Sequence, residues 1–115
     1  MGQILIVEDD WLIASGYVRP LAKAGYEVVG PFAYVEPALQ AVEEQPVTVG
    51  LLDLNLGSRN SLPVANLLQE RHIPFAFLTA HRRDDLPQHL LGHPLIAKPV
   101  TSATLLDIVR KMLTA

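Results

Sequence analysis

The stretch that decides the fold is Val49-Gly50-Leu51-Leu52-Asp53-Leu54-Asn55-Leu56-Gly57. Residues 47–52 are almost wholly apolar and lead directly into the carboxylate of Asp53. A continuous apolar run of this length is typical of a strand that is buried on both faces of a parallel sheet. In open α/β sheets ligands bind outside the carboxyl ends of the strands, so Asp53 is a candidate site residue. Taken alone, an aspartate at the end of a strand is more often a carboxylate that caps a turn.

The length and composition indicate one domain over residues 1–115, since 115 residues with half of them hydrophobic can bury one core. The net charge of -3 offers no basic surface, which disfavours direct binding of nucleic acid. The chain has no cysteine, so disulfides and thiolate metal sites are excluded, and this suits a cytoplasmic protein. We expect no signal peptide and no contact with the membrane, because every apolar run is too short.

Strands and helices are predicted in strict alternation along the chain. Besides residues 47–52, the predicted strands are residues 3–7, 26–29, 73–78 and 95–97. The predicted helices are residues 11–24, residues 37–45, a helix from Ser61, a short helix within residues 82–91, and a closing helix after Thr101. Connections of this length predict an α/β fold: a flavodoxin-like (βα)5 sandwich with a parallel sheet of strand order 2-1-3-4-5 and helices on both faces.

Several local features predict how these elements begin and end. Pro20 predicts a kink or an early end of the first helix, because proline lacks the amide that a helix interior needs. Gly30-Pro31 is predicted to close the second strand, and residues 54–60 are predicted to form a loop. Ser61 and Thr101 are predicted to cap the helices that follow them.

Chemically active side chains follow four of the five predicted strands. Glu8 and Asp9 follow the first strand, Asp53 the third, Thr79 the fourth and Lys98 the fifth. In the predicted order the first and third strands are neighbours, so their three carboxylates converge. Mutually repelling carboxylates at a solvent-facing edge suit a hard cation such as Mg²⁺. Thr79 alone could be a helix cap and Lys98 alone a solvated lysine, but their joint placement favours a site.

This site suits the transfer of a phosphoryl group. A carboxylate that attacks phosphorus forms an acyl phosphate. The Thr79 hydroxyl can donate to a phosphoryl oxygen, and the Lys98 ammonium can neutralise its charge. Asp53 is the expected nucleophile, because it stands alone on the central strand, opposite the residues expected to bind the cation.

Four motifs then identify a family. They occur in order along the chain: Ile4-Leu5-Ile6-Val7-Glu8-Asp9-Asp10, Leu51-Leu52-Asp53-Leu54-Asn55-Leu56-Gly57, Leu78-Thr79-Ala80 and Lys98-Pro99. With these motifs the chain resembles the receiver domain of two-component response regulators along its whole length. A narrower similarity exists to mainly standalone receivers whose fourth strand ends in Phe-x-Thr-Gly-Tyr. Here that segment is Phe77-Leu78-Thr79-Ala80-His81, a partial match.

The resemblance implies a role for each site residue. It implies that Asp53 is the phosphoacceptor, that Thr79 is the switch hydroxyl and that Lys98 pairs with the phosphoryl group. The Mg²⁺ ligands that it implies are Glu8, Asp9, Asp53 and the backbone carbonyl of Asn55. It also implies a cis peptide bond at Lys98-Pro99.

Two positions concern how such a receiver would switch. Many receivers carry an aromatic residue three positions before the lysine, where this chain has Leu95. We therefore expect the response of Thr79 to pass to the segment 82–91. Whether His81 controls the access of water to the acyl phosphate or is a solvated loop histidine stays open.

The resemblance implies a signalling phosphoacceptor rather than an enzyme. Its implied partners are a histidine kinase or histidine phosphotransfer protein and a downstream protein target, and it leaves dimer formation open. The first alternative is a receiver-like module that docks without phosphorylation. An enzyme with an aspartyl-phosphate intermediate is disfavoured, because Asn55 stands where such an enzyme has a second aspartate. The acidic loop after the first strand disfavours a nucleotide binder, whose loop would be rich in glycine and hydroxyls.

Overall fold

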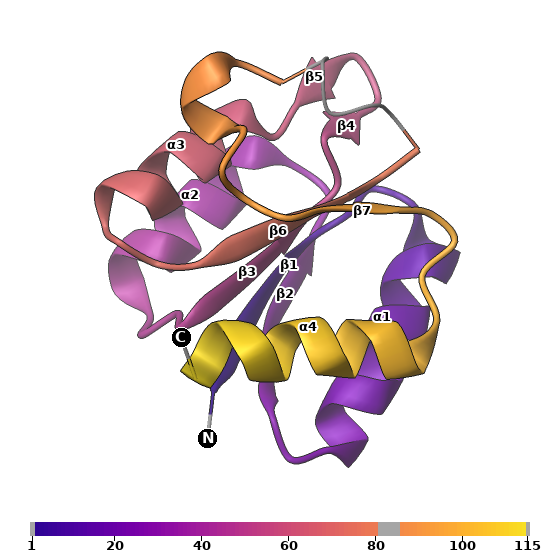
Figure 1. Cartoon of the computed structure of the whole chain (residues 1–115). Coiled ribbons are helices and arrows are strands. Elements are labelled where there is room, and N and C mark those ends of the chain that lie inside the picture. The colour runs from indigo at the N-terminus through magenta and orange to yellow at the C-terminus, as the bar shows by residue number, and fades with distance from the viewer. Residues whose placement is uncertain (1, 81–85, 115) are drawn as a thin grey trace.

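A computed structural model describes residues 2–80 and 86–114, and its centre is a five-stranded parallel sheet (Figure 1). The strands lie in the order β2-β1-β3-β6-β7. Their bounds are Gln3–Val7 for β1, Glu27–Phe32 for β2, Val49–Leu52 for β3, Phe75–Thr79 for β6 and Leu95–Ala97 for β7. Counted along this sheet alone, the order is 2-1-3-4-5, so the predicted flavodoxin-like topology is confirmed.

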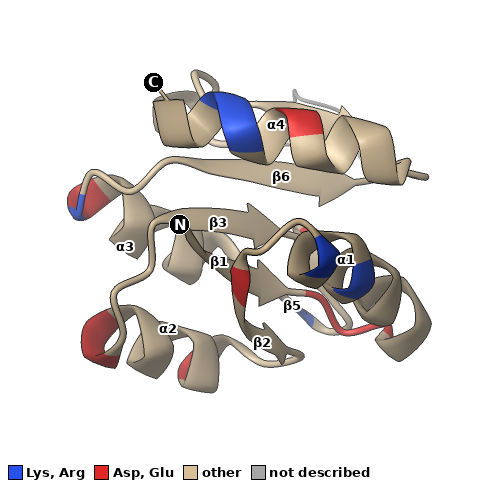
Figure 2. Cartoon of the chain, turned by 90° about the horizontal axis from the view of Figure 1, so that it is seen from below, with Lys and Arg blue, Asp and Glu red and all other residues tan. Residues whose placement is uncertain are grey.

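Helices cover both faces of the sheet. The first, α1 (Trp11–Lys23), and the last, α4 (Ser102–Thr114), lie on one face. On the other face lie α2 (Val35–Glu44) and α3 (Leu62–Glu70), as the view from below in Figure 2 shows. In the part of the chain that the structure describes, no helix has the length and apolar character needed to cross a bilayer.

The sheet separates two hydrophobic cores. Side chains alternate along a strand, so Leu5 and Val7 of β1 face α2 and α3, whereas Ile4 and Ile6 face α1 and α4. All four side chains are fully buried. Burial on both faces explains why the strand sequences are continuously apolar rather than alternating. The polar residues that follow the strands are thereby confined to the edges of the sheet.

The first helix does not end early. It runs through Pro20 to Lys23, and Gly25 follows with a φ of 95°. The prediction of an early end was therefore wrong. Tyr17 and Leu21, on either side of the proline, are both buried, and their packing offsets the one hydrogen bond that Pro20 cannot make.

Two further predictions were wrong: where the second strand ends, and that residues 54–60 form a loop without strands. The strand β2 continues through Gly30-Pro31 to Phe32, with a cis peptide bond at Gly30-Pro31. β2 is an edge strand, the place in a sheet where proline is tolerated. The segment predicted as a loop contains an antiparallel hairpin of β4 (Asn55–Leu56) and β5 (Arg59–Asn60).

The helix caps were predicted with mixed success. Thr101 caps α4, since its Oγ1 accepts a hydrogen bond from the Thr104 amide at 3.1 Å. Ser61 stands at the N-cap position of α3 as predicted, but its buried hydroxyl has no hydrogen-bond partner among the described residues, so it makes no side-chain cap. Its backbone is not in the extended conformation of an N-cap, and the Asn60 side chain accepts from the Leu62 amide instead, at 3.0 Å.

Part of the segment that the sequence predicts least clearly, residues 82–85, lies outside the described residues, as does His81. Of the remainder, Gln88–Leu90 forms η2, a short 3-10 helix within the segment where a short helix was predicted. Histidines join this region to α3: His89 contacts Asn66 Oδ1 at 2.8 Å, and His93 contacts Gln69 Oε1 at 2.7 Å. The fully buried Leu90 anchors η2 in the core beside α2 and α3.

Candidate functional site

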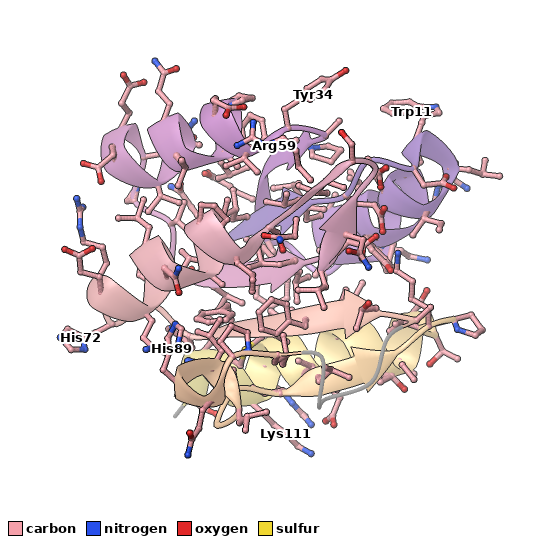
Figure 3. The ribbon with its side chains drawn as sticks, turned by 90° about the horizontal axis from the view of Figure 1, so that it is seen from above. Trp11, Tyr34, Arg59, His72, His89 and Lys111 are labelled. Carbon is pink, nitrogen blue, oxygen red and sulfur yellow. The ribbon has the colours of Figure 1, made fainter. Side chains whose placement is uncertain are left out.

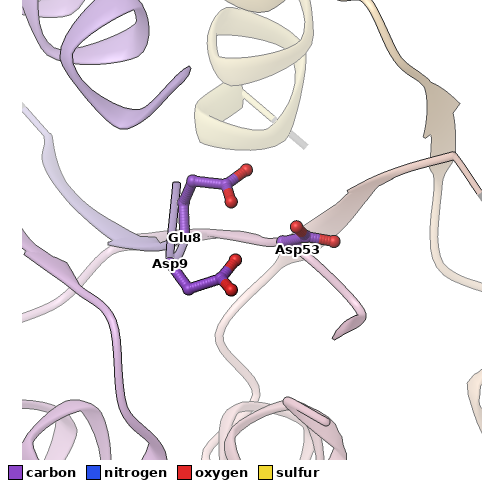
Figure 4. A group of neighbouring side chains, drawn as sticks. All are labelled: Glu8, Asp9 and Asp53. Carbon is purple, nitrogen blue, oxygen red and sulfur yellow. The ribbon is translucent and has the colours of Figure 1, made fainter. Parts of the chain in front are cut away.

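The sheet brings three carboxylates together at one edge. Val7 of β1 pairs with Leu52 of β3, so the next residues, Glu8 and Asp53, leave neighbouring strands at the same level. Asp9 lies beside them, and carboxylate oxygens of all three residues lie within 4.8 Å of one another (Figure 4). Glu8 is 3% exposed, whereas Asp9 faces solvent. The cluster therefore has a buried side and an open side.

An ammonium group sits between two of these carboxylates. Lys98 follows β7, and its Nζ donates to Glu8 Oε1 at 2.5 Å and to Asp53 Oδ2 at 2.9 Å. The three side chains are only 16%, 1% and 11% exposed, for Lys98, Glu8 and Asp53 in that order. Because these groups are shielded from water, salt screens their attraction less than that of an ion pair on the surface. Lys98 thus joins the far strand of the sheet to the central acids.

Backbone amides hold the two acids from the other side. The Asp10 amide donates to Glu8 Oε2 at 3.1 Å, and the Asn55 amide donates to Asp53 Oδ1 at 3.2 Å. Asp10 also caps α1 through its own carboxylate, which explains the third acid of the run. Each carboxylate is therefore fixed by one backbone donor and one cation, so its orientation is set before any ligand binds.

Thr79 lies at the carboxyl end of β6, and its side chain is buried. It pairs with Ala97 of β7, and its carbonyl accepts a hydrogen bond from the Lys98 amide at 3.0 Å. The Thr79 hydroxyl and the Lys98 ammonium thus come from neighbouring strands whose carboxyl ends are joined by a hydrogen bond. The Lys98-Pro99 peptide bond is cis, as the resemblance to receiver domains implied.

Burial and charge act in opposite directions on Glu8. Burial is the larger effect and raises the pKa of this carboxyl to about 7, against the hydrogen bonds from Lys98 and the Asp10 amide. Burial lowers the pKa of Lys98, but the hydrogen bonds to Glu8 and Asp53 outweigh it and leave that pKa raised. The site therefore keeps Lys98 charged while making a charged Glu8 costly.

This cost predicts a pH dependence of stability in the metal-free protein. An acid whose pKa is higher in the folded state stabilises the fold below its unfolded pKa, and this contribution is lost as the pH rises through the folded pKa. For Glu8 the loss falls between pH 4.5 and about 7. At roughly 1.4 kcal/mol per pKa unit, it amounts to about 3 kcal/mol. Urea unfolding with the metal chelated should show this loss relative to Glu8→Gln, and parallel pH profiles for the two proteins would contradict it.

The residues present fit a hard divalent cation. Among the residues that the structure describes, the cluster that could hold a metal ion offers only carboxylate oxygens, and the exposed Asp9 leaves room for bound water. Such a donor set matches Mg²⁺, which prefers oxygen ligands and usually keeps several waters. Glu8, Asp9 and Asp53 could supply the carboxylates, and Asn55 lies beside them at the start of β4.

The sequence predicted Asn55 as a site residue, but not that Asn55 begins a hairpin of β4 and β5. A Cβ placed on Gly57 at its tip would lie 4.0 Å from Asp9 Oδ2, so the hairpin borders the acidic cluster. Arg59 pairs with Glu36 of α2 and ties the hairpin to the body of the domain. The signal was available, because Gly57-Ser58 between two residue pairs is a known hairpin pattern.

Two aromatic side chains lie on the surface, apart from the buried site. Trp11 directly follows the acids at the start of α1 and is 75% exposed, and Tyr34 is 71% exposed. Figure 3 shows both side chains projecting outward. The only tryptophan of the chain therefore begins the helix next to the acidic cluster.

Comparisons with known proteins agree with this arrangement. Residues 4–110 match the model of the response regulator receiver domain family. The transcriptional regulatory protein PdtaR of Mycobacterium tuberculosis is 25% identical over 108 residues, which are 93% of this chain and 53% of PdtaR. The chain thus spans about half the length of the curated relatives that it matches.

Solved structures share both the fold and part of the sequence. SdrG from Sphingomonas melonis Fr1 is 34% identical, with a TM-score of 0.83 over 98% of this chain and 97% of SdrG. The BeF3-activated conformation of SdrG, described as from Pseudomonas melonis Fr1, is 36% identical, with a TM-score of 0.79 over 96% of this chain and 95% of that one. Because the family model covers almost the whole chain, the chain belongs to the response regulator receiver domain family.

Proposed function

We propose that this chain is a phosphorylatable receiver in which Asp53 accepts a phosphoryl group from a phosphohistidine donor. The observation that carries the proposal is the contact of one ammonium, that of Lys98, with both Glu8 and Asp53 at the edge where Asp9 also lies. This arrangement offers a nucleophilic carboxylate, a fixed positive charge and a set of oxygen ligands. Phosphoryl transfer needs little more than positioning and neutralisation of charge.

In the proposed reaction the Asp53 carboxylate forms an O–P bond while the P–N bond of the donor imidazole breaks. The electron pair of that bond leaves with the imidazole nitrogen. The Lys98 ammonium, already beside Asp53 Oδ2, neutralises part of the charge that collects on the phosphoryl oxygens. When bound, Mg²⁺ would supply further neutralisation of those oxygens. We propose Glu8, Asp9, Asp53 and the Asn55 carbonyl as its protein ligands.

Thr79 is the proposed switch residue. Its carbonyl accepts a hydrogen bond from the Lys98 amide, so a movement of Thr79 toward a phosphoryl oxygen would also move the end of β7. With the half-buried Leu95 on β7 in place of an aromatic residue, we propose that the change passes to the region around η2. The BeF3-activated conformation of SdrG supports the existence of two states in a related receiver. The output would be a changed affinity for a downstream protein.

The wider setting is also part of the proposal. We propose a single receiver domain over residues 1–115, located in the cytoplasm and serving a histidine kinase or a histidine phosphotransfer protein. It would act as a signalling phosphoacceptor rather than as an enzyme on other substrates. Direct binding of nucleic acid or membrane is not proposed, and formation of a homodimer is a further possibility for its output.

The test is the mass of the intact protein after incubation with Mg²⁺ and a small acyl-phosphate donor. We expect one added phosphoryl group, and none when the metal is chelated, because the three clustered carboxylates repel an incoming phosphoryl group without a cation. The absence of added mass under conditions that label another receiver would refute the proposal. It would favour the alternative of a docking module that acts without phosphorylation.

A further inference from the structure

The edge strand β2 carries a bulge directly beside the site. Leu5 of β1 pairs with Val29 of β2, but Val7 pairs with Phe32. One residue of β1 therefore stands opposite two residues of β2, namely Gly30 and Pro31. An extra residue of this kind bends the strand and changes the direction of the groups that follow it, and bulges are common beside active sites.

Gly30 is required by the geometry of this bulge. Its φ is +104°, a backbone conformation that residues with a side chain rarely adopt. A Cβ at this position would lie 2.8 Å from the Ile6 carbonyl oxygen and 2.9 Å from the Phe32 amide nitrogen. Both neighbours are backbone atoms of the paired strands, so they cannot turn away as a flexible side chain could. Any larger residue must therefore push β2 away from the end of β1.

The bulge is connected to the site through one peptide unit. The amide of Glu8 donates to the Phe32 carbonyl at 2.9 Å, and the carbonyl of Val7 accepts from the Asp53 amide at 2.9 Å. These two groups belong to the same peptide bond, Val7–Glu8. Its amide is hydrogen-bonded to Phe32 of β2, and its carbonyl is hydrogen-bonded to Asp53, which follows β3. Its position therefore sets where the side chains of Glu8 and Asp53 begin.

We propose that Gly30 is a positioning residue for the acidic site. By allowing the bulge, it places the Phe32 carbonyl where it fixes the Val7–Glu8 peptide, and so fixes the separation of the Glu8 and Asp53 carboxylates. Gly30 touches neither cation nor phosphoryl group, and it acts through Phe32 and Glu8. The consequence for cation binding rests on the proposed function, whereas the consequence for the peptide does not.

The test compares Gly30→Ala with Gly16→Ala. The same substitution at Gly16, in the exposed part of α1, meets no atom within 4 Å. Mg²⁺ alone is titrated into each protein and followed by the fluorescence of Trp11 and by the amide signals of Glu8 and Asp53. We expect Gly30→Ala to weaken Mg²⁺ binding by about 10- to 100-fold, the range found when groups that orient metal ligands are removed. Gly16→Ala should bind as the unchanged protein does.

A second readout needs no metal. In the metal-free proteins we expect hydrogen exchange at the Glu8 and Asp53 amides to be at least about tenfold faster in Gly30→Ala. The Phe77 amide, bonded to the Pro94 carbonyl on the far side of the sheet, should be unchanged. A purely structural role of Gly30 would accelerate exchange at all of these amides together. Uniform acceleration, or unchanged exchange at Glu8 and Asp53, would overturn the proposal.

The two proposals can fail separately. If the unchanged protein does not bind Mg²⁺, the proposed function fails, and the exchange rates still decide the role of Gly30. If Gly30→Ala does not fold, hydrogen exchange in the unchanged protein tests the role of Gly30. The proposal requires that the Glu8 amide exchange as slowly as the Phe77 amide. A Glu8 amide that exchanges freely would overturn it.

Discussion

Asp53→Asn is expected to lose the added phosphoryl group completely in the mass measurement. An amide oxygen is a far weaker nucleophile than a carboxylate, and it cannot form the acyl phosphate. The protein should stay folded, because asparagine has the same shape and can still accept a hydrogen bond from the Asn55 amide. Lys98 would retain its contact with Glu8. Circular dichroism and urea unfolding of the variant check that only the chemistry is lost.

The matched control is Asp10→Asn, the same change two residues after Glu8. Asp10 caps α1, and asparagine caps helices about as well as aspartate does, so labelling should persist. Asp53→Asn should also lower the pKa of Glu8 in the metal-free protein, because the charge of Asp53 is one of the causes that raise it. Retained labelling of Asp53→Asn would mean that another carboxylate, Glu8 or Asp9, is the acceptor.

The sequence was sufficient for the parts of the structure that depend on pattern. Continuous apolar runs followed by polar residues predict both the strands and the edge at which Asp53 and Lys98 emerge. The order of the strands follows from the alternation with helices, and it brings Glu8 next to Asp53. These features are visible in the sequence because burial on both faces of a sheet constrains every residue of a strand.

The parts that were missed depend on contacts between distant segments. Pro20 stays inside α1 because neighbouring side chains pack against the sheet, which a local proline rule does not include. The Gly30 bulge exists only because β1 lies beside β2, so the dipeptide Gly30-Pro31 looked like an end of the strand. Within residues 2–80 and 86–114 the buried hydroxyl of Ser61 finds no partner, and no pattern of single residues distinguishes it from a serine whose side chain caps a helix.

Lys98→Met is expected to weaken both the fold and the reaction. Methionine keeps much of the length of the side chain but leaves Glu8 and Asp53 facing each other without an ammonium. Removing one partner of a buried ion pair costs about 3–5 kcal/mol. The free energy of unfolding of the metal-free protein at pH 8.5 should therefore fall by about 3 kcal/mol. Labelling should fall by roughly 100-fold, as when one fixed donor to developing charge is removed.

The pH and the metal distinguish this mechanism from a simple loss of packing. At pH 5 Glu8 is mostly protonated, because its pKa of about 7 rises further without Lys98, so the difference from the unchanged protein should shrink to what the pair of Lys98 with Asp53 contributes. Saturating Mg²⁺ should also restore much of the stability lost at pH 8.5, since it returns positive charge to the carboxylates. Lys23→Met, at an exposed lysine in the last turn of α1, should change stability by less than about 0.5 kcal/mol. A loss for Lys98→Met that is equal at pH 5 and pH 8.5 and insensitive to Mg²⁺ would show that packing, and not charge, is what Lys98 contributes.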